Sequence, residues 1–147
     1  MILVTGAAGF IGSNLVAALA ARGEREIVVC DLLGDDDKWR NLAKHELADF
    51  IEPEELLFYL DGHEGSIDAI YHMGAISSTT ETDADLIMDT NFRLSLDLWN
   101  WCAIHEVPFI YASSAATYGD RTEGFDDDGS CAALAGLRPM NAYGWSK

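Results

Sequence analysis

The sequence has few basic residues, few cysteines and no long apolar run. Its nine lysines and arginines are outnumbered by 25 aspartates and glutamates, which gives a net charge of −16 at pH 7 over 147 residues. Such a chain is poorly suited to bind nucleic acid or an anionic membrane, because both carry dense negative charge. No apolar run is long enough to span a bilayer, and no basic segment precedes the first apolar residues as in a signal peptide. We therefore expect a cytosolic protein that contacts neither nucleic acid nor membrane.

The three cysteines indicate neither a disulfide framework nor a metal site. Cys30, Cys102 and Cys131 are odd in number and lack the spacing of metal ligands. Two of them lie in apolar segments, which favours buried free thiols over disulfides. We expect no bound metal and assign the thiols no role.

The remaining composition is that of an ordinary globular protein, with 49% apolar and 23% charged residues. The length suits one domain with a full hydrophobic core, and there is no repeat, low-complexity tract or linker. Strand-like and helix-like patterns alternate along the chain, which predicts an α/β fold with a parallel sheet. Strands are expected from residue 2 and over 26–31, 47–51, 67–73 and 107–112, and helices from residues 11 and 53 and over 83–105.

The first apolar run leads directly into three regularly spaced glycines. Gly6, Gly9 and Gly12 follow Ile2, Leu3 and Val4 within a few residues, and a helical apolar pattern begins at once. In such a strand-to-helix turn, Gly6 permits the bend, Gly9 leaves room for backbone N–H groups to approach a pyrophosphate, and Gly12 allows close helix packing. The helix N-terminus adds unpaired donors and the positive end of its dipole. The pattern therefore predicts a dinucleotide site.

An acidic residue stands where a dinucleotide fold needs one. Asp31 ends the second expected strand, about 20 residues beyond the glycines. A carboxylate there accepts hydrogen bonds from ribose hydroxyls, which favours NAD, whereas a nearby cation favours the 2′-phosphate of NADP. Lys38 and Arg40 follow an acidic run at 35–37, and these charges can equally be a solvated loop. These residues leave NAD and NADP both open.

A cluster of hydroxyl side chains follows the fourth expected strand. Ser78 and Glu81 have the spacing of a helix capping box, which explains one hydroxyl of the segment 77–82 but not all five. At the carboxyl end of a strand, such a cluster suits a polyhydroxylated ligand such as a sugar. Gly74 and Ala75 just before it are small enough for a cofactor to pass close to the backbone. His72 ends the strand without a second ligand at metal spacing, so we expect it to be structural.

One long helix is expected over 83–105. Apolar residues recur at nearly heptad spacing from 87 to 101, and a helix of this length measures about 35 Å. Trp99 and Cys102 widen its apolar surface, which fits either core packing alone or a second partner such as another subunit. Asn91 interrupts the apolar stripe and, if buried, needs hydrogen-bond partners.

The end of the chain contains a tyrosine and a lysine four residues apart. If a helix begins near Ala142, Tyr143 and Lys147 project from the same face. A free tyrosine has a pKa of about 10 and is a poor base at neutral pH, but a neighbouring ammonium and a cationic nicotinamide both favour the phenolate. Ser114, after the fifth strand, can then hold a substrate oxygen while Tyr143 takes its proton. The pair alone is common by chance, but together with the glycine loop it is specific.

Together these motifs resemble the extended short-chain dehydrogenase/reductase family, whose members rework nucleotide sugars with bound NAD or NADP. The resemblance rests on the three glycines, Ser114 and the Tyr143-x-x-x-Lys147 pair, and it covers the whole chain. Segments 5–14, 74–81 and 111–119 are similar to members that epimerise an ADP-linked heptose, and 74–81 is the most discriminating. The resemblance implies a Rossmann-type doubly wound parallel sheet, here ending after about five strands, an ADP-sugar substrate, and a homo-oligomer in the full-length protein.

The resemblance also assigns roles to individual residues. It implies that Tyr143 and Lys147 are catalytic and that Ser114 assists. The implied cofactor residues are Gly6, Gly9, Phe10, Ile11, Gly12, Asp31, Lys38, Met73, Gly74, Ala75, Ile76, Ser77, Asn91, Tyr143 and Lys147, and the implied substrate residues are Ser77, Ser78, Thr79 and Ser114. Leu32 and Pro53 stand where polar or basic residues are expected near an NADP 2′-phosphate, which leaves Lys38 for that role. NADP is the cofactor expected by resemblance, and NAD is the alternative.

The implied reaction oxidises and then reduces one sugar carbon. Hydride leaves C6″ of the heptose for the nicotinamide, giving a transient ketone, and returns to the opposite face, a step of lipopolysaccharide core synthesis. This needs a proton donor on each side, and the family's second base is a lysine well downstream of Lys147. We therefore expect residues 1–147 to form an incomplete NAD(P)-binding domain of such an epimerase, inactive alone. The alternatives are another NAD-dependent nucleotide-sugar epimerase or dehydratase, or a catalytically inert dinucleotide-binding fragment.

Overall fold

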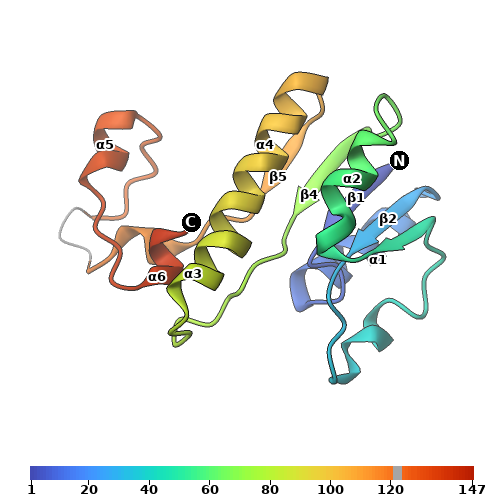
Figure 1. Cartoon of the computed structure of the whole chain (residues 1–147), viewed down its shortest axis with the longest axis horizontal. Coiled ribbons are helices and arrows are strands. Elements are labelled where there is room, and N and C mark those ends of the chain that lie inside the picture. Colours follow the sequence, from blue (N-terminus) through green and yellow to red (C-terminus); the bar gives the residue numbers. More distant parts are fainter. Residues whose placement is uncertain (121–123) are drawn as a thin grey trace. The chain divides into compact units, whose positions relative to one another are not determined.

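The structure, a computed structural model, describes residues 1–120 and 124–147. Within the span predicted as one NAD(P)-binding domain, the chain divides into two compact units. The first unit contains residues 1–74 and 97–111, and the second contains residues 75–96 and 112–147. Figure 1 follows both units along the sequence by colour.

The first unit is built on a five-stranded parallel sheet in the order β3-β2-β1-β4-β5. Its strands are β1 (Ile2–Thr5), β2 (Ile27–Cys30), β3 (Asp49–Ile51), β4 (Ala69–His72) and β5 (Phe109–Tyr111). The last four lie inside their predicted ranges but are shorter. The strand order reverses between β1 and β4, and such a switch point is where open α/β sheets bind ligands at the carboxyl ends of their strands.

Both faces of this sheet are covered, as a doubly wound fold requires. Adjacent residues of a strand point to opposite faces, and Leu3 and Val4 are both fully buried. Helix α1 (Phe10–Ala21) packs on β1 and β2, where Val16 and Leu19 join the hydrophobic cluster around Val4. The prediction of a Rossmann-type α/β fold is confirmed.

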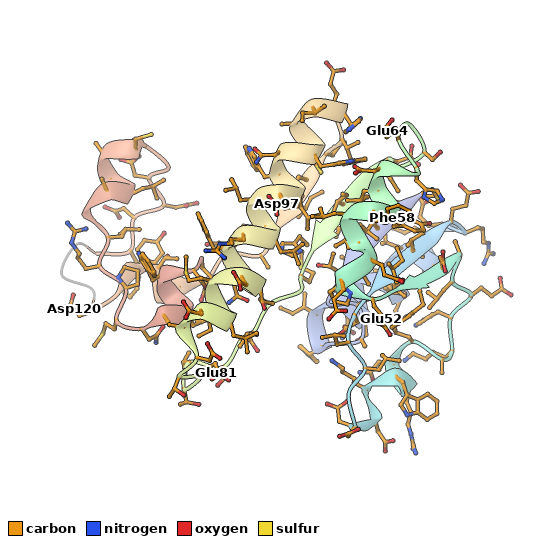
Figure 2. All side chains as sticks on the ribbon, in the orientation of Figure 1. Glu52, Phe58, Glu64, Glu81, Asp97 and Asp120 are labelled. Atoms are coloured by element: carbon orange, nitrogen blue, oxygen red, sulfur yellow. The ribbon has the colours of Figure 1, made fainter. Side chains whose placement is uncertain are left out.

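The helix predicted from residue 53 is short and amphipathic. It begins as a 3-10 turn at Pro53–Glu55 and continues as α2 (Leu56–Asp61). Leu56 and Leu60, four residues apart, are fully buried, as expected for one face of a helix. Phe58 projects from the opposite side of α2 into solvent (Figure 2).

The helical segment predicted over 83–105 forms, but it contains a π-helical turn. Helix α3 (Ala84–Ile87) passes into π-helical residues Met88–Arg93, and α4 (Leu94–His105) completes the segment. A π-helical turn adds a residue to one turn of the helix, and such turns are frequent at functional sites. Asn91 lies in this turn and is fully buried.

The capping box expected between Ser78 and Glu81 does not start this helix. The side chain of Asp83 caps α3 instead, because it accepts a hydrogen bond of 3.0 Å from the N–H of Leu86. The Ser78 hydroxyl accepts from the N–H of Thr80, and the Glu81 carboxylate accepts from the N–H groups of residues 82 and 83. Both side chains therefore shape the turn before the helix.

The rest of the second unit includes short helices separated by non-helical segments. They are a 3-10 turn at Ala115–Tyr118, α5 (Cys131–Gly136) and α6 (Ala142–Trp145). The side chains of Ser130 and Asn141 cap α5 and α6. No helix was predicted over residues 131–136, so α5 is an addition. In residues 1–120 and 124–147, none of the helices has the length and apolarity needed to cross a membrane.

Candidate functional site

The glycine turn lies at the carboxyl end of β1 and admits no side chains at two positions. Gly6 has a φ of +62°, and a Cβ built there would be 2.6 Å from the backbone nitrogen of Gly74. A Cβ on Gly12 would be 2.2 Å from the carbonyl oxygen of Gly6. Both distances are far below van der Waals contact, so these positions require glycine. The turn is therefore pressed between the start of α1 and the end of β4.

The backbone donors that remain for a ligand belong to α1. The N–H of Gly6 donates to the Cys30 carbonyl at 2.8 Å, and the N–H of Gly9 donates to the Gly6 carbonyl at 3.1 Å. The first N–H groups of an α-helix have no carbonyl partner within the helix. Here they belong to Phe10 and Ile11, which are 86% and 62% exposed. The glycines thus supply space, and the helix start supplies donors and a positive dipole end, which suits a diphosphate.

Asp31 links the end of β2 to the glycine turn. The residue is buried, and its Oδ2 accepts a 2.7 Å hydrogen bond from the N–H of Ala8. Its Oδ1 forms an ion pair with Nζ of Lys38 at 3.1 Å. The structure thus brings together the two side chains that the resemblance places at the adenosine ribose. Each carboxylate oxygen still has a lone pair to accept a further hydrogen bond.

A hollow of about 540 Å³ opens beside the glycine turn and the first half of α1. This volume lies in the range of small-molecule sites. It is lined by Ala8, Gly9, Phe10, Ser13, Asn14, Ala17, Asp36, Lys38, Asn41 and Lys44. Lys38 and Lys44 thus face one hollow together with Asp36, in a chain of net charge −16, and the two lysines are its candidate partners for an anion.

Sequence reasoning missed Asn41 and Lys44, which line this hollow. Residues Asp37–Asn41 form a 3-10 turn that starts when the Asp36 side chain accepts from the N–H of Lys38. The Asn41 amide then donates to the Ala8 carbonyl at 2.8 Å and ties this turn to the glycine turn. An aspartate two residues before its backbone donor is a turn signal that was available in the sequence. The approach of Lys44 to α1 had no comparable signal.

His72 has the surroundings of a structural residue. It is buried, and its Nδ1 lies 2.7 Å from the hydroxyl of Thr5. That hydroxyl also accepts from the N–H of Gly74 at 3.0 Å. The imidazole ring stacks with the rings of Phe109 and Tyr111, each at a centroid distance of 5.9 Å. His72 therefore joins β1, β4 and β5 and helps to place Gly74 beside the glycine turn.

The segment after Gly74 begins with a backbone held by Asn91. Oδ1 of Asn91 accepts from the Ile76 N–H at 2.8 Å, and Nδ2 donates to the Ile76 carbonyl at 3.0 Å. Asn91 thereby obtains the partners that its burial requires, and it influences the segment through the backbone of Ile76. The three candidate substrate residues that follow, Ser77, Ser78 and Thr79, are exposed.

Ser114 and Tyr143 lie on two turns that touch through their backbones. The Ser114 hydroxyl accepts from the N–H of Ala116 at 3.1 Å and so caps the 3-10 turn that follows it. A Cβ on Gly144 would be 2.6 Å from the Ala116 carbonyl oxygen, so α6 can contact this turn only because residue 144 is glycine. The second unit thus brings the Ser114 turn and the Tyr143 helix together.

Lys147 follows α6 and contacts the segment that precedes Ser114. Helix α6 ends at Trp145, and the Lys147 side chain turns to donate from Nζ to the Ala112 carbonyl at 3.0 Å. Burial lowers the pKa of the Lys147 ammonium, because desolvation disfavours the charged form. Ala112 precedes Ser114 by two residues, so Lys147 is hydrogen-bonded to the same short segment that carries Ser114.

The cysteines and the acidic side chains form no metal site in the described parts of the chain. No group of three or more histidine, cysteine, aspartate or glutamate residues there could hold a metal ion. All three cysteines are free thiols, of which Cys30 and Cys102 are buried and Cys131 is exposed. Burial, aided by the charge of Asp31, raises the pKa of Cys30 to about 12, and burial raises the pKa of Cys102 to about 11.

A parallel sheet in the order 3-2-1-4-5, with a glycine turn at the switch point, defines a Rossmann-type α/β protein. Residues 2–147 match the NAD dependent epimerase/dehydratase family, and the chain belongs to that family. This membership agrees with the family resemblance of its motifs.

Individual relatives include two heptose epimerases. The chain is 48% identical to the ADP-L-glycero-D-manno-heptose-6-epimerase of Fusobacterium nucleatum, over 100% of this chain and 45% of that protein. The Helicobacter pylori ADP-L-glycero-D-manno-heptose-6-epimerase is similar in structure, with a TM-score of 0.78 and 29% identity over 99% of this chain and 47% of that one. A UDP-glucuronic acid 4-epimerase from Bacillus cereus, solved with NAD, gives a TM-score of 0.79 and 28% identity over 99% and 48%. The chain thus spans about half the length of the relatives it matches.

Proposed function

We propose that this chain is part of an ADP-L-glycero-D-manno-heptose 6-epimerase, an enzyme of lipopolysaccharide core synthesis. One observation carries the choice of sugar, namely the 48% identity along the entire chain to the F. nucleatum enzyme of that name. The exposed Ser77, Ser78 and Thr79 support it, because three adjacent hydroxyl side chains suit the recognition of a polyhydroxylated ligand.

The cofactor in this proposal is NADP, held first by its diphosphate. The N–H groups of Phe10 and Ile11 and the dipole of α1 would hold the diphosphate. The Asp31 carboxylate would accept a hydrogen bond from a ribose hydroxyl. Lys38 and Lys44, which line the hollow, would supply positive charge to the 2′-phosphate. Pairing with Lys38 also reduces the repulsion that Asp31 would exert on a phosphate.

When bound, the nicotinamide accepts a hydride from the substrate and later returns it. The residues of this chain manage the protons and the sugar oxygen. Tyr143 takes the proton of the C6″ hydroxyl as the hydride leaves, which gives a transient ketone. When the hydride returns to the opposite face, the second acid/base group, which lies outside residues 1–147, gives a proton to the ketone oxygen. The hydroxyl of Ser114 accepts from a backbone N–H and therefore keeps its own proton to donate to the sugar oxygen. Lys147, whose Nζ donates to the Ala112 carbonyl, is the proposed cationic partner of Tyr143 at this site.

The test uses residues 1–147 alone and joined to the part of the F. nucleatum enzyme that they do not cover. Each protein receives NADP and the heptose substrate, and proton NMR follows the configuration at C6″. We expect epimerisation by the joined protein, loss of at least a thousandfold in its Tyr143→Phe variant, and no turnover by the 147-residue chain. A joined protein that binds NADP but leaves ADP-heptose unchanged would contradict the proposed substrate.

A second function, 4-epimerisation of a UDP-sugar with NAD, is favoured by the fold similarity to the B. cereus enzyme. UDP-glucuronic acid in the same assay separates the two activities. Turnover of the UDP-sugar in place of the ADP-sugar would establish the second function and exclude the first.

A further inference from the structure

Two buried polar side chains in the second unit take no part in the proton transfers proposed above. Asn91 is fully buried and Ser146 is 2% exposed, although both carry polar groups. They bond to each other across 55 residues of sequence, with Nδ2 of Asn91 donating to Oγ of Ser146 at 3.1 Å. Burying polar side chains destabilises a fold unless each polar group has a hydrogen-bond partner. The other hydrogen bonds of Asn91 and Ser146 therefore identify the backbone segments that this pair fixes.

The Asn91 end of this pair holds the segment that follows Gly74. Its Oδ1 and Nδ2 engage the N–H and the carbonyl of Ile76, so both backbone groups of one residue are held by one side chain. Asn91 itself lies in the π-helical turn, whose extra residue interrupts the regular helix at this point. Few side chains other than an amide provide an acceptor and two donors in this geometry.

The Ser146 end of the pair holds the turn that carries Tyr143. Its hydroxyl accepts from Asn91 and donates to the Tyr143 carbonyl at 2.8 Å, so its single proton and one lone pair are both used. The bonds therefore run in one direction, from Asn91 through Ser146 to the backbone of Tyr143. Helix α6 has only four residues, and a single turn is unstable without support from its surroundings.

We propose that Ser146 is a positioning residue, which fixes the backbone of Tyr143 relative to Ile76 through Asn91. This inference rests on the proposed function. It explains how α6, a single helical turn, holds the proposed catalytic Tyr143 in a fixed position relative to Ile76, which the resemblance assigns to the cofactor. Ser146 is buried and acts in this proposal only through Asn91 and the Tyr143 carbonyl. Its effect is transmitted by two hydrogen bonds and should be lost when either partner is removed.

Amide hydrogen exchange tests this connection without substrate. In the 147-residue chain, Ser146→Ala should raise the exchange rate of the Ile76 N–H by about tenfold, because Asn91 loses a partner and holds Ile76 less firmly. The control Ser130→Ala removes a cap hydroxyl from α5 in the same unit and should leave Ile76 unchanged. If Ser146 stabilises only its own turn, exchange will rise in residues 142–147 and not at Ile76, which would overturn the proposal.

A double-mutant comparison tests whether Ser146 and Asn91 act on Ile76 through the same connection, and a milder variant of Ser146 covers the case in which Ser146→Ala does not fold. Ser146→Ala should have no additional effect on Ile76 in an Asn91→Ala background, whereas independent effects would multiply and would contradict the connection. Ser146→Cys is close in size and retains a weak donor, so it should give an intermediate rate.

Kinetics of the joined epimerase link the connection to catalysis. Ser146→Ala should lower kcat by about tenfold with little change in KM, because the phenol is displaced while the substrate groups remain. An unchanged kcat would exclude a positioning role. If the wild-type protein epimerises no sugar, the proposed function fails, but the exchange result at Ile76 still decides whether the connection exists.

Discussion

The glycine turn can form only because Gly6 and Gly12 have no Cβ atom. At Gly12 the backbone is helical, so only the space around the Cβ matters there, and the nearest atom is a backbone carbonyl oxygen that cannot turn aside. The spacing of the glycines predicted both a tight turn and close packing. It did not reveal that the N–H groups of Gly6 and Gly9 already have partners, the Cys30 carbonyl on β2 and the Gly6 carbonyl.

Gly12→Ala should therefore lower the free energy of unfolding by about 2 kcal/mol or more, the cost of forcing an atom into a filled site. The matched control is Gly136→Ala in α5, where nothing lies within 4 Å of an added Cβ. That variant should gain up to about 1 kcal/mol, as usual for glycine to alanine in a helix. Urea unfolding monitored by circular dichroism measures both, and equal effects would contradict the close approach.

We expect Lys44 to affect the affinity for NADP relative to NAD. Lys44→Met should weaken NADP binding by about tenfold and leave NAD binding unchanged, because only NADP carries the 2′-phosphate. Arg25→Met removes one positive charge elsewhere in the first unit, where the arginine is paired with Glu46, and should affect neither cofactor. Calorimetric titration decides the matter, and stronger binding of NAD than NADP to the wild-type chain would count against the roles of both lysines.

The buried thiols predict an alkaline limit to stability. In the unfolded chain a thiol loses its proton near its ordinary pKa of 9.0, whereas in the fold Cys30 and Cys102 keep theirs to about 12 and about 11. Between these values the unfolded state binds fewer protons, so stability falls as pH rises. Each thiol contributes a slope of up to about 1.4 kcal/mol per pH unit.

Unfolding by urea between pH 9 and pH 11 measures this slope. Cys30→Ala should make it shallower, whereas Cys131→Ala should not, because Cys131 is exposed. A slope that does not change in Cys30→Ala would show that this thiol ionises equally in both states.

Among the helical segments, regular patterns were predictable and local exceptions were not. Apolar spacing located the segment 83–105, but one additional residue in a turn leaves no mark on that spacing, so the π-helical turn was missed. The helix α5 was missed although Ser130 precedes an alanine-rich stretch, which is a recognisable N-terminal signal. The capping residue of α3 was placed too early, since Ser78 and Glu81 have the spacing of a capping box but the side chain of Asp83 caps the helix.

For the candidate site, too, the sequence predicted the motifs but not the contacts between side chains that are distant along the chain. The order of the glycine turn, Ser114, Tyr143 and Lys147 along the chain identified the family, because motif spacing is a property of sequence. The pairing of Asp31 with Lys38 and of Asn91 with Ser146 depends on how loops return in space, and spacing does not encode it. Lys147 also lies beyond the end of α6, so the expected helical face is only partly formed.

The whole molecule combines a net charge of −16 with a candidate site for the phosphates of a dinucleotide. The first unit carries the glycine turn and the lysine-lined hollow, and the second carries Ser114, Tyr143 and Lys147. A net charge of −16 repels a dinucleotide at long range, so binding depends on donors within a few ångströms, and added salt should weaken it less than it weakens binding by a basic protein.

The central claim is that the start of α1 receives the diphosphate of a nicotinamide dinucleotide. Titration of the isotope-labelled chain with NADP, followed by amide chemical shifts, addresses it directly. We expect the largest shifts at the N–H groups of Phe10 and Ile11, with residues 131–136 unaffected. Saturable binding that leaves Phe10 and Ile11 unshifted, or no binding of either NADP or NAD at millimolar concentration, would contradict the claim.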